Sequence, residues 1–395
     1  MKKKNYIAVA LLCVFICIAL LSSGTTFNNF KRTFFADSTS DKTIRVGVLE
    51  PLSGVYKDNG IAQLEGILLA NKLKPKAAGM KIEIIEADTQ GSVYVAESAI
   101  ADLLDKDPTL VLGSCGDAVT LTAAEKFEKA KIPAITPTAT NPLITENHRY
   151  YFGMSFGDAA QGNIAAEYIR NNLGLDKAAV IRTEGDISTS EMVRTFQKKF
   201  KEETDEASKG KVITIDLAIK DNNYDSYIKK LKKEKIKAVF APVSIVEAEK
   251  LFDSAKKLKA SDILFIGPES WHTNDMKFMM TEYPDLKIMA SADMASAMKE
   301  SKEYEKFVKE FKKEYNRVPS EENARAFDAY MVAVEALEKT GGKGGDKCVK
   351  AMLNTKDFPA VTGNVSFNKT GGAVKQINLD FLSDGKWKTV FTVKN

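Results

Sequence analysis

The sequence is poor in the residues from which most catalytic and metal centres are built. It contains only two histidines, His148 and His272, so a centre with several histidine ligands is almost excluded. Its four cysteines form no CxxC pair, which excludes a zinc ribbon and a thioredoxin-type motif. No GxxxxGK[ST] loop, GxGxxG motif or GxSxG elbow occurs. We therefore expect no metal, no cofactor and no catalytic residue.

Neither sign of charge dominates the chain. Lys and Arg total 57, Asp and Glu total 53, and the formal net charge is +4 over 395 residues. So small an excess does not favour nucleic-acid binding, and the lysine-rich stretches 229–237 and 309–313 contain glutamates, which is typical of solvated helix faces. With 44% hydrophobic and 28% charged residues, the composition is that of a globular protein long enough for two domains.

The N-terminus has the pattern of an export signal. Lysines occupy positions 2–4, an uncharged apolar run covers residues 6–21, and small residues follow at 22–24. Two interpretations stay open for residues 1–24, a cleaved signal peptide and an uncleaved membrane anchor, with residues 25–42 as a polar linker. Bulky residues precede Cys13 and Cys17, so we expect no lipidation at either.

Both interpretations place the rest of the chain outside the cytoplasm. We expect it to be secreted, periplasmic or anchored to the outer face of the cytoplasmic membrane. Cys115 and Cys348 would be free to pair in an oxidising compartment. The sequence does not show whether they lie close together, and two unpaired, buried thiols are the simpler expectation.

Strand and helix patterns alternate through most of the chain, as in a parallel sheet covered on both faces. In the first run the expected strands are 43–49, 80–86, 109–112 and 132–136, and the expected helices are 60–73, 93–104 and 117–129. In the second run the expected helices are 159–172, 190–202, 224–234 and 246–258, and the expected strands are 178–182, 212–217, 238–242 and 263–266. Two such runs predict an α/β protein with two doubly wound lobes.

The last third follows another pattern. Two long helices are expected at 303–315 and 321–337, and strands at 361–367, 377–382 and 389–393. Two glycine pairs at 341–342 and 344–345 predict a loop between these helices and the strands.

Several stretches, in order, resemble the leucine/isoleucine/valine-binding protein family, the substrate-binding proteins of branched-chain amino-acid ABC importers. They are VGVLEPLSG (46–54), KAKIPAITPTATNPLIT (129–145), LFIGPES (264–270) and RVPSEENARAFDAYMVAVEAL (317–337), together with Phe156, Asp158 and Gln161. The resemblance implies the type I periplasmic binding protein fold, with two Rossmann-like lobes joined by a three-crossing hinge near Gln161, Ala290 and Thr370. Lobe 1 would comprise 43–161 and 291–370, and lobe 2 would comprise 162–290 and 371–395.

The resemblance also implies a site for a ligand carboxylate in lobe 1. The matching positions lie in GSCGDAVT (113–120) and at Thr138, Ala139 and Thr140, whose hydroxyls and backbone N–H groups suit an anion. Asp117 replaces the family's hydroxyl residue at the start of the helix, and it would repel a ligand carboxylate. The alternative role for Asp117 is that of a helix N-cap, and the two roles do not exclude each other.

In lobe 2, Glu269 matches the family acid that receives the ligand's ammonium group. If Asp117 and Glu269 both face the cleft, two acids line it. The hypothesis is then a ligand with more positive charge than leucine, or one without a free carboxylate, such as an amine or amide.

The aromatic positions that cover the ligand in the family are altered in this chain. Asn59 and Ile187 stand at two such positions, and Ser244 at another. Trp271, close to Glu269, is expected either to compensate as a ligand contact or to pack in its lobe. His272 is expected at the surface rather than on the ligand.

A binding function is therefore favoured over an enzyme. The resemblance implies an extracytoplasmic protein that captures a small-molecule ligand, an amino acid or a related amine or amide, and delivers it to an ABC permease. The alternative is a ligand-sensing module of a membrane signalling complex with the same fold. Either role implies association with the membrane through the N-terminus or a partner, and neither involves a nucleic acid.

Overall fold

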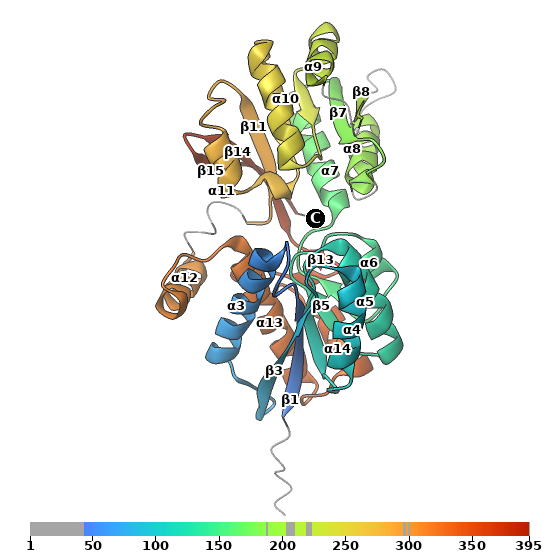
Figure 1. Ribbon diagram of the computed structural model, residues 1–395, viewed down its shortest axis with the longest axis vertical. Coiled ribbons are helices and arrows are strands. Elements are labelled where there is room, and N and C mark those ends of the chain that lie inside the picture. The colour runs from blue at the N-terminus through green and yellow to red at the C-terminus, as the bar shows by residue number, and fades with distance from the viewer. Residues whose placement is uncertain are drawn as a thin grey trace, which may run out of the picture. The chain divides into compact units, whose positions relative to one another are not determined.

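The computed structural model describes residues 43–186, 189–202, 210–218, 223–294, 298 and 301–394 (Figure 1). The predicted signal or anchor at 1–24 and the predicted polar linker at 25–42 lie outside the described residues. Among the described residues, no helix has the length and apolar character needed to cross a membrane.

The first part of the chain builds a six-stranded sheet with the order β2-β3-β1-β4-β5-β6. Its strands are β1 (Ile44–Glu50), β2 (Lys76–Ala77), β3 (Met80–Asp88), β4 (Leu110–Gly113), β5 (Ala134–Thr136) and β6 (Tyr151–Gly153). Neighbouring strands are parallel except for β2 against β3. Strands β1, β4 and β5 are apolar and buried nearly throughout, as expected for a parallel sheet with helices on both faces.

Helices cover both faces of this sheet. They are α3 (Lys57–Leu73), α4 (Val93–Leu104), α5 (Asp117–Ala130), α6 (Leu143–Glu146), α12 (Lys302–Tyr315), α13 (Glu321–Lys339) and α14 (Gly345–Leu353). The core on one face contains side chains of α3, α12, α13 and α14. The core on the other face contains side chains of α4 and α5. We call the six-stranded sheet with these helices lobe 1.

A seven-stranded sheet with the order β15-β14-β11-β10-β9-β7-β8 forms the centre of lobe 2. Its strands are β7 (Lys177–Thr183), β8 (Lys211–Leu217), β9 (Ala238–Phe240), β10 (Leu264–Gly267), β11 (Lys287–Ala292), β14 (Gln376–Ser383) and β15 (Lys386–Lys394). The strands from β8 to β11 pair in parallel, and β14 and β15 add an antiparallel edge.

Lobe 2 also carries helices on both faces of its sheet, with one core on each. They are α7 (Asp158–Glu167), which continues as a π-helical turn at Tyr168–Asn172, α8 (Ser190–Glu202), α9 (Tyr224–Lys233), α10 (Ile245–Lys257), the 3₁₀ turn η3 (Glu269–Trp271) and α11 (Asn274–Met279). The doubly wound α/β architecture predicted from the sequence is confirmed.

One glycine in each lobe allows two helices to approach closely. A Cβ atom on Gly66 of α3 would lie 2.2 Å from the carbonyl oxygen of Asn323 in α13. A Cβ atom on Gly162 of α7 would lie 2.2 Å from the carbonyl oxygen of Met192 in α8. Real Cβ atoms do not come so close to a backbone oxygen, so both helix pairs depend on the missing side chain.

The lobe boundaries and the three crossings that the resemblance implies stay predictions. Helix α7 packs in the lobe 2 core from Ala160 on, β11 runs to Ala292, and β14 starts at Gln376. The prediction of a strand over 361–367 is wrong: only Ser366–Phe367 is a strand (β12), which pairs with β13 (Ala373–Val374). Strands β6 and β11 and helix α14 were not predicted.

Candidate functional site

Each sheet has a switch point where the chain reverses its direction of winding. In lobe 1, β1 lies between β3 and β4, so the loops after β1 and β4 leave the sheet in opposite directions. In lobe 2, β7 lies between β8 and β9 in the same way. Ligands of open α/β sheets bind outside the carboxyl ends of the strands at such points. The loops that follow β4 and β5 in lobe 1 and β10 in lobe 2 carry most of the predicted site residues.

Asp117 does not cap helix α5, so this interpretation is corrected. The N-cap is Gly116, whose φ of 85° places it in the left-handed region, and Asp117 is the first helical residue. The Asp117 Oδ1 atom instead accepts the backbone N–H groups of Thr140 (3.1 Å) and Asn141 (3.3 Å) in the loop after β5. A carboxylate of the chain itself thus takes the amide donors of this loop.

The three predicted residues of the 138–140 loop have different surroundings. Ala139 is buried, and its N–H donates to Thr136 Oγ1 at 3.0 Å, so it supports the loop from within. Thr138 is half-buried, and its Oγ1 accepts from Gln63 Nε2 at 3.1 Å. Thr140 is half-buried, and its hydroxyl donates to the carboxyl group of Asp158 at the start of α7.

Cys115 lies beside Thr138 and Gln63 but is not a nucleophile. Burial, with further contributions from Glu50 and Glu322, raises the pKa of the Cys115 thiol to about 12. The Glu50 carboxyl is itself fully buried at the end of β1, and burial raises its pKa well above the ordinary value. A protonated thiol does not attack electrophiles. Cys115 and Cys348 are both free, and only Cys348 is fully buried.

Glu269 begins the turn η3 after β10 and keeps a quarter of its side chain exposed. Its backbone N–H donates to Gln161 Oε1 at 2.8 Å, and Gln161 Nε2 contacts Asp158 Oδ1 at 3.4 Å. Because Asp158 accepts a hydrogen bond from Thr140, a chain of polar contacts joins the lobe 1 loop that bonds to Asp117 with Glu269 in lobe 2. The structure therefore connects the two acids that the sequence singles out.

Asp158 is the most perturbed acid of this chain of contacts. Only 2% of the residue is exposed, and burial raises its pKa to about 7. The hydrogen bond from Thr140 acts against this rise, whereas the negative charges of Asp117 and Glu191 add to it. Asp158 is thus partly protonated at neutral pH, and a cation placed nearby would favour loss of its proton.

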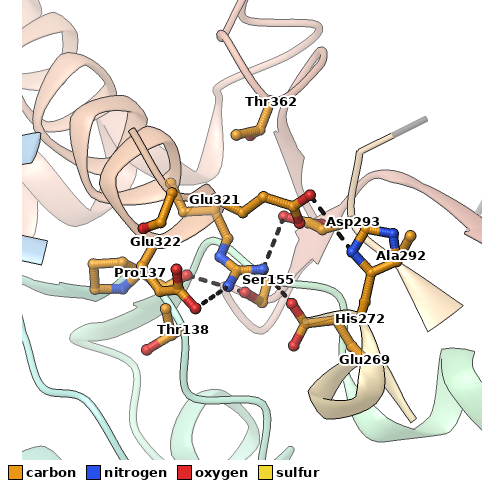
Figure 2. A network of polar contacts seen from close by, with 12 residues as sticks. Pro137, Thr138, Ser155, Glu269, His272, Ala292, Asp293, Glu321, Glu322 and Thr362 are labelled. Carbon is orange, nitrogen blue, oxygen red and sulfur yellow. Dashed lines mark hydrogen bonds and ion pairs between the residues drawn. The ribbon is translucent and has the colours of Figure 1, made fainter. Parts of the chain in front are cut away.

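Arg325 of α13 is a residue of the site that the sequence analysis missed. Its Nη1 donates to Glu269 Oε1 at 2.7 Å and lies 3.8 Å from Asp293 Oδ2, and its Nη2 lies 3.9 Å from Glu322 Oε1. Figure 2 shows this network, in which the side chains of Glu269, Asp293 and Glu322 point toward a common centre. The available signal was the single arginine of the predicted helix 321–337, which stands among Ala324, Ala326 and Phe327.

Of the two roles left open for Trp271 the structure favours packing in its lobe, and the surface position expected for His272 is wrong. Trp271 is fully buried, its indole N–H donates to Val243 O at 2.8 Å, and its ring packs against Phe252. It belongs to the lobe 2 core and is not exposed to a ligand. His272 is not at the surface either: its side chain is 3% exposed, bonds Asp380 at 3.0 Å and stacks on Trp387.

The altered aromatic positions contribute little to the described site. Asn59 is exposed in the first turn of α3. Ile187 lies outside the described residues. Ser244 is the N-cap of α10, where its hydroxyl accepts the N–H of Glu247.

A cavity of about 370 Å³ opens at Glu269 between segments of both lobes. Its lining includes Glu269 and His272 of lobe 2 and Tyr304, Glu321 and Glu322 of lobe 1. This volume is in the range of small-molecule pockets. Three glutamates and one lysine, Lys277, are the charged residues of its lining. Within the described part of the chain, no group of His, Cys, Asp and Glu side chains is arranged to hold a metal ion.

Comparison with known proteins identifies the family. The profile of a family described as "Periplasmic binding protein" matches residues 43–379. The chain belongs to this periplasmic binding protein family. Its members are binding proteins rather than enzymes, and the family agrees with the resemblance seen in the sequence.

The curated relatives are distant and match only in part. An amino acid binding protein of Pseudomonas aeruginosa is 33% identical over 34% of this chain and 38% of its own length. A leucine-specific-binding protein of Salmonella typhimurium is 25% identical over 57% of this chain and 61% of its own length. The chain thus spans less than two thirds of the length of either relative.

Solved structures of leucine-binding and solute-binding proteins match over about nine tenths of the chain. A leucine binding protein from Thermotoga maritima has a TM-score of 0.76 at 22% identity and covers 89% of this chain and 99% of its own. A solute binding protein of an ABC transporter from Rhodopseudomonas palustris, in complex with 3,4-dihydroxy benzoic acid, has a TM-score of 0.74 at 23% identity, covering 90% and 98%. At these identities the likeness establishes the type I periplasmic binding protein fold.

Proposed function

We propose that this periplasmic binding protein captures a small polar solute, an amine or amide related to an amino acid, and delivers it to an ABC import permease. The family membership and the polar loops at the carboxyl ends of the strands support a binding role. The apolar run at residues 6–21 supports a place outside the cytoplasmic membrane.

The contact of Asp117 with the 140–141 amides is the observation that carries our choice of ligand. A ligand carboxylate needs unoccupied donors, and here Asp117 Oδ1 already accepts the N–H groups of Thr140 and Asn141. The negative charge of Asp117 would also repel a second carboxylate. Asp158 and Glu322 add further acidic groups to the region. We therefore favour an amine or an amide that has no free carboxylate.

Four compounds with one carbon skeleton test this preference by isothermal titration calorimetry. They are leucine, leucinamide, 4-methylpentanamide and 4-methylpentanoate, chosen because a relative is named as leucine-specific. We expect leucinamide or 4-methylpentanamide to bind at one per chain, and both carboxylates to bind at least tenfold more weakly. A thermal-shift panel of amino acids, amides and polyamines extends the search, because ligand at 100 times its Kd adds about 2.7 kcal/mol of stability.

The Asp117→Ser variant tests whether the Asp117 carboxylate, rather than the shape of the site, weakens the binding of leucine. We expect it to bind leucine more tightly than the parent, because the amides of Thr140 and Asn141 become available and the repulsion is lost. Asp102→Ser, in the exposed part of α4, is the matched control and should leave leucine binding unchanged. Tight 1:1 binding of leucine that Asp117→Ser does not improve would rule out the proposed ligand class.

Delivery to a permease is tested separately. The ligand-loaded protein should stimulate ATP hydrolysis by its permease reconstituted in liposomes, and the ligand-free protein should do so less. Equal rates with and without ligand would argue against the transport role while leaving the binding role intact.

A further inference from the structure

Glu269 already has a cationic partner within the chain. Arg325 Nη1 lies 2.7 Å from Glu269 Oε1, within the distance of a charge-assisted hydrogen bond. Glu269 belongs to η3 in lobe 2, whereas Arg325 belongs to α13 in lobe 1. The ion pair therefore joins the two lobes at the acid that the family resemblance assigns to a ligand ammonium group.

Arg325 is held in place by more than this contact. The residue is 4% exposed, and Asp293 and Glu322 lie 3.8 and 3.9 Å from its guanidinium group. Burial alone would lower the pKa of Arg325, but Glu269, Asp293 and Glu322 raise it above the ordinary value. The guanidinium group is therefore always charged.

The three acids around Arg325 depend on its charge to different degrees. Asp293 has its own cation, because Lys375 Nζ lies 2.9 Å from Asp293 Oδ2. Glu322 is one third exposed and can be hydrated. Glu269 is the closest partner of Arg325 and faces the 370 Å³ cavity. A second contact joins the same two segments, since His272 Nδ1 lies 3.6 Å from Glu321 Oε1.

We propose that Arg325 is a specificity-determining residue, an internal cation that competes with the ligand's amino group for Glu269. This inference rests on the proposed function and narrows its ligand class. An amine must displace the guanidinium group from Glu269, which leaves a buried charge with poorer partners. A neutral amide can bind without breaking this pair. The protein therefore selects amides over amines of the same shape.

The test compares leucinamide, which is cationic, with the neutral 4-methylpentanamide. In the parent protein the amide should bind at least tenfold more tightly. In Arg325→Met the order should reverse, because Glu269 and Glu322 lose their cation and attract the amine. Arg325→Lys keeps the positive charge, and it should retain the preference for the amide. An unchanged ratio of the two dissociation constants in Arg325→Met would overturn the proposal.

Arg317→Met is the matched control. Arg317 pairs with Glu65 inside lobe 1 and is nearly half exposed, so its loss should not alter the ratio of the two dissociation constants. Circular dichroism checks that each variant is folded.

A second readout needs no ligand and keeps the two proposals distinguishable. If none of the four compounds binds to the parent or the variants, the proposed function fails, and Arg325 is then judged by a double-mutant cycle in urea unfolding. Arg325→Met and Glu269→Gln should each lower the urea concentration at the midpoint of unfolding. The double variant should be at least as stable as the less stable of the two single variants. Additive effects would show that the two residues are not paired and would overturn the inference.

Discussion

The side-chain oxygen of Gln161 accepts the backbone N–H of Glu269 at 2.8 Å. This bond connects the start of α7 with the turn after β10, and it fixes the direction in which the Glu269 carboxylate leaves the chain. The amide nitrogen of the same Gln161 side chain contacts Asp158, so one side chain bridges two acids. Gln161 is only 2% exposed, so water cannot readily take the place of its partners, and loss of these contacts would destabilise the protein.

Replacing Gln161 by leucine should weaken ligand binding more than it weakens the fold. The loss of the bond to the Glu269 N–H should cost about 1 kcal/mol, or roughly a fivefold rise in Kd. Calorimetry with the best ligand of the panel measures the change. Gln197→Leu removes a glutamine that bonds Thr214 elsewhere in lobe 2, and it should leave Kd unchanged. Equal losses in the two variants would show that Gln161 has no special role.

The raised pKa of Asp158 predicts a stability that falls as pH rises. The folded chain keeps the Asp158 proton to about pH 7, whereas the ordinary pKa of an aspartic acid, which applies in the unfolded chain, is 3.8. Between these values the folded state binds more protons, so Asp158 favours folding at low pH and this contribution is lost toward pH 7. The slope approaches about 1.4 kcal/mol per pH unit where only the folded state is protonated.

Asp158→Asn isolates this effect. The asparagine variant lacks the titration, so its free energy of unfolding should fall less than that of the parent between pH 5 and pH 8. Urea unfolding at several pH values measures both curves. Parallel curves for parent and variant would mean that the pKa of Asp158 is not raised in the folded state.

The tryptophans at positions 271 and 387 both lie next to His272 and provide a natural probe of this region. The His272 and Trp387 rings stack with centroids 4.7 Å apart, and Trp387 is 9% exposed. His272→Ala should uncover Trp387, shift the emission maximum to longer wavelength and increase quenching by acrylamide. His148→Ala changes the other histidine, which contacts the carbonyls of Leu143 and Ile144, and should leave the spectrum unaltered.

Gly66 should tolerate no side chain. Gly66→Ala would force α3 away from Asn323 in α13, and we expect a loss of about 1–3 kcal/mol in the free energy of unfolding. Gly153→Ala is a suitable control, because the nearest atom to its added Cβ is a Thr145 methyl carbon at 3.8 Å. Similar stability of the two variants would contradict the close helix contact.

The parallel strands and long helices were predictable because their signals are local. The alternation of apolar residues around 43–49 and the helical spacing in 321–337 both survive in the structure as β1 and α13. Strand β11 (KIMASA) was not predicted, because its small residues, alanine and serine, do not produce the alternation of apolar and polar residues that indicates a strand. The predicted strand at 361–367 is mostly a turn, since the N–H groups of Val361 and Thr362 donate to the buried Asp328.

The site was predictable only in part, because some of its contacts join residues that are far apart in the sequence. The resemblance located Thr140 and Glu269, and the structure connects both through Asp158 and Gln161. It did not reveal Arg325, because the partner of Arg325 lies 56 residues away in the sequence. Two roles stayed open for Trp271, because a tryptophan close to a site residue looks the same in sequence whether it faces a ligand or the core.

Native mass spectrometry of the protein as purified, with identification of the released solute, tests the central claim most directly. The account predicts one small solute per chain that carries an amide or amine and has no free carboxylate. An α-amino acid or another carboxylic acid, bound at one per chain, would contradict it.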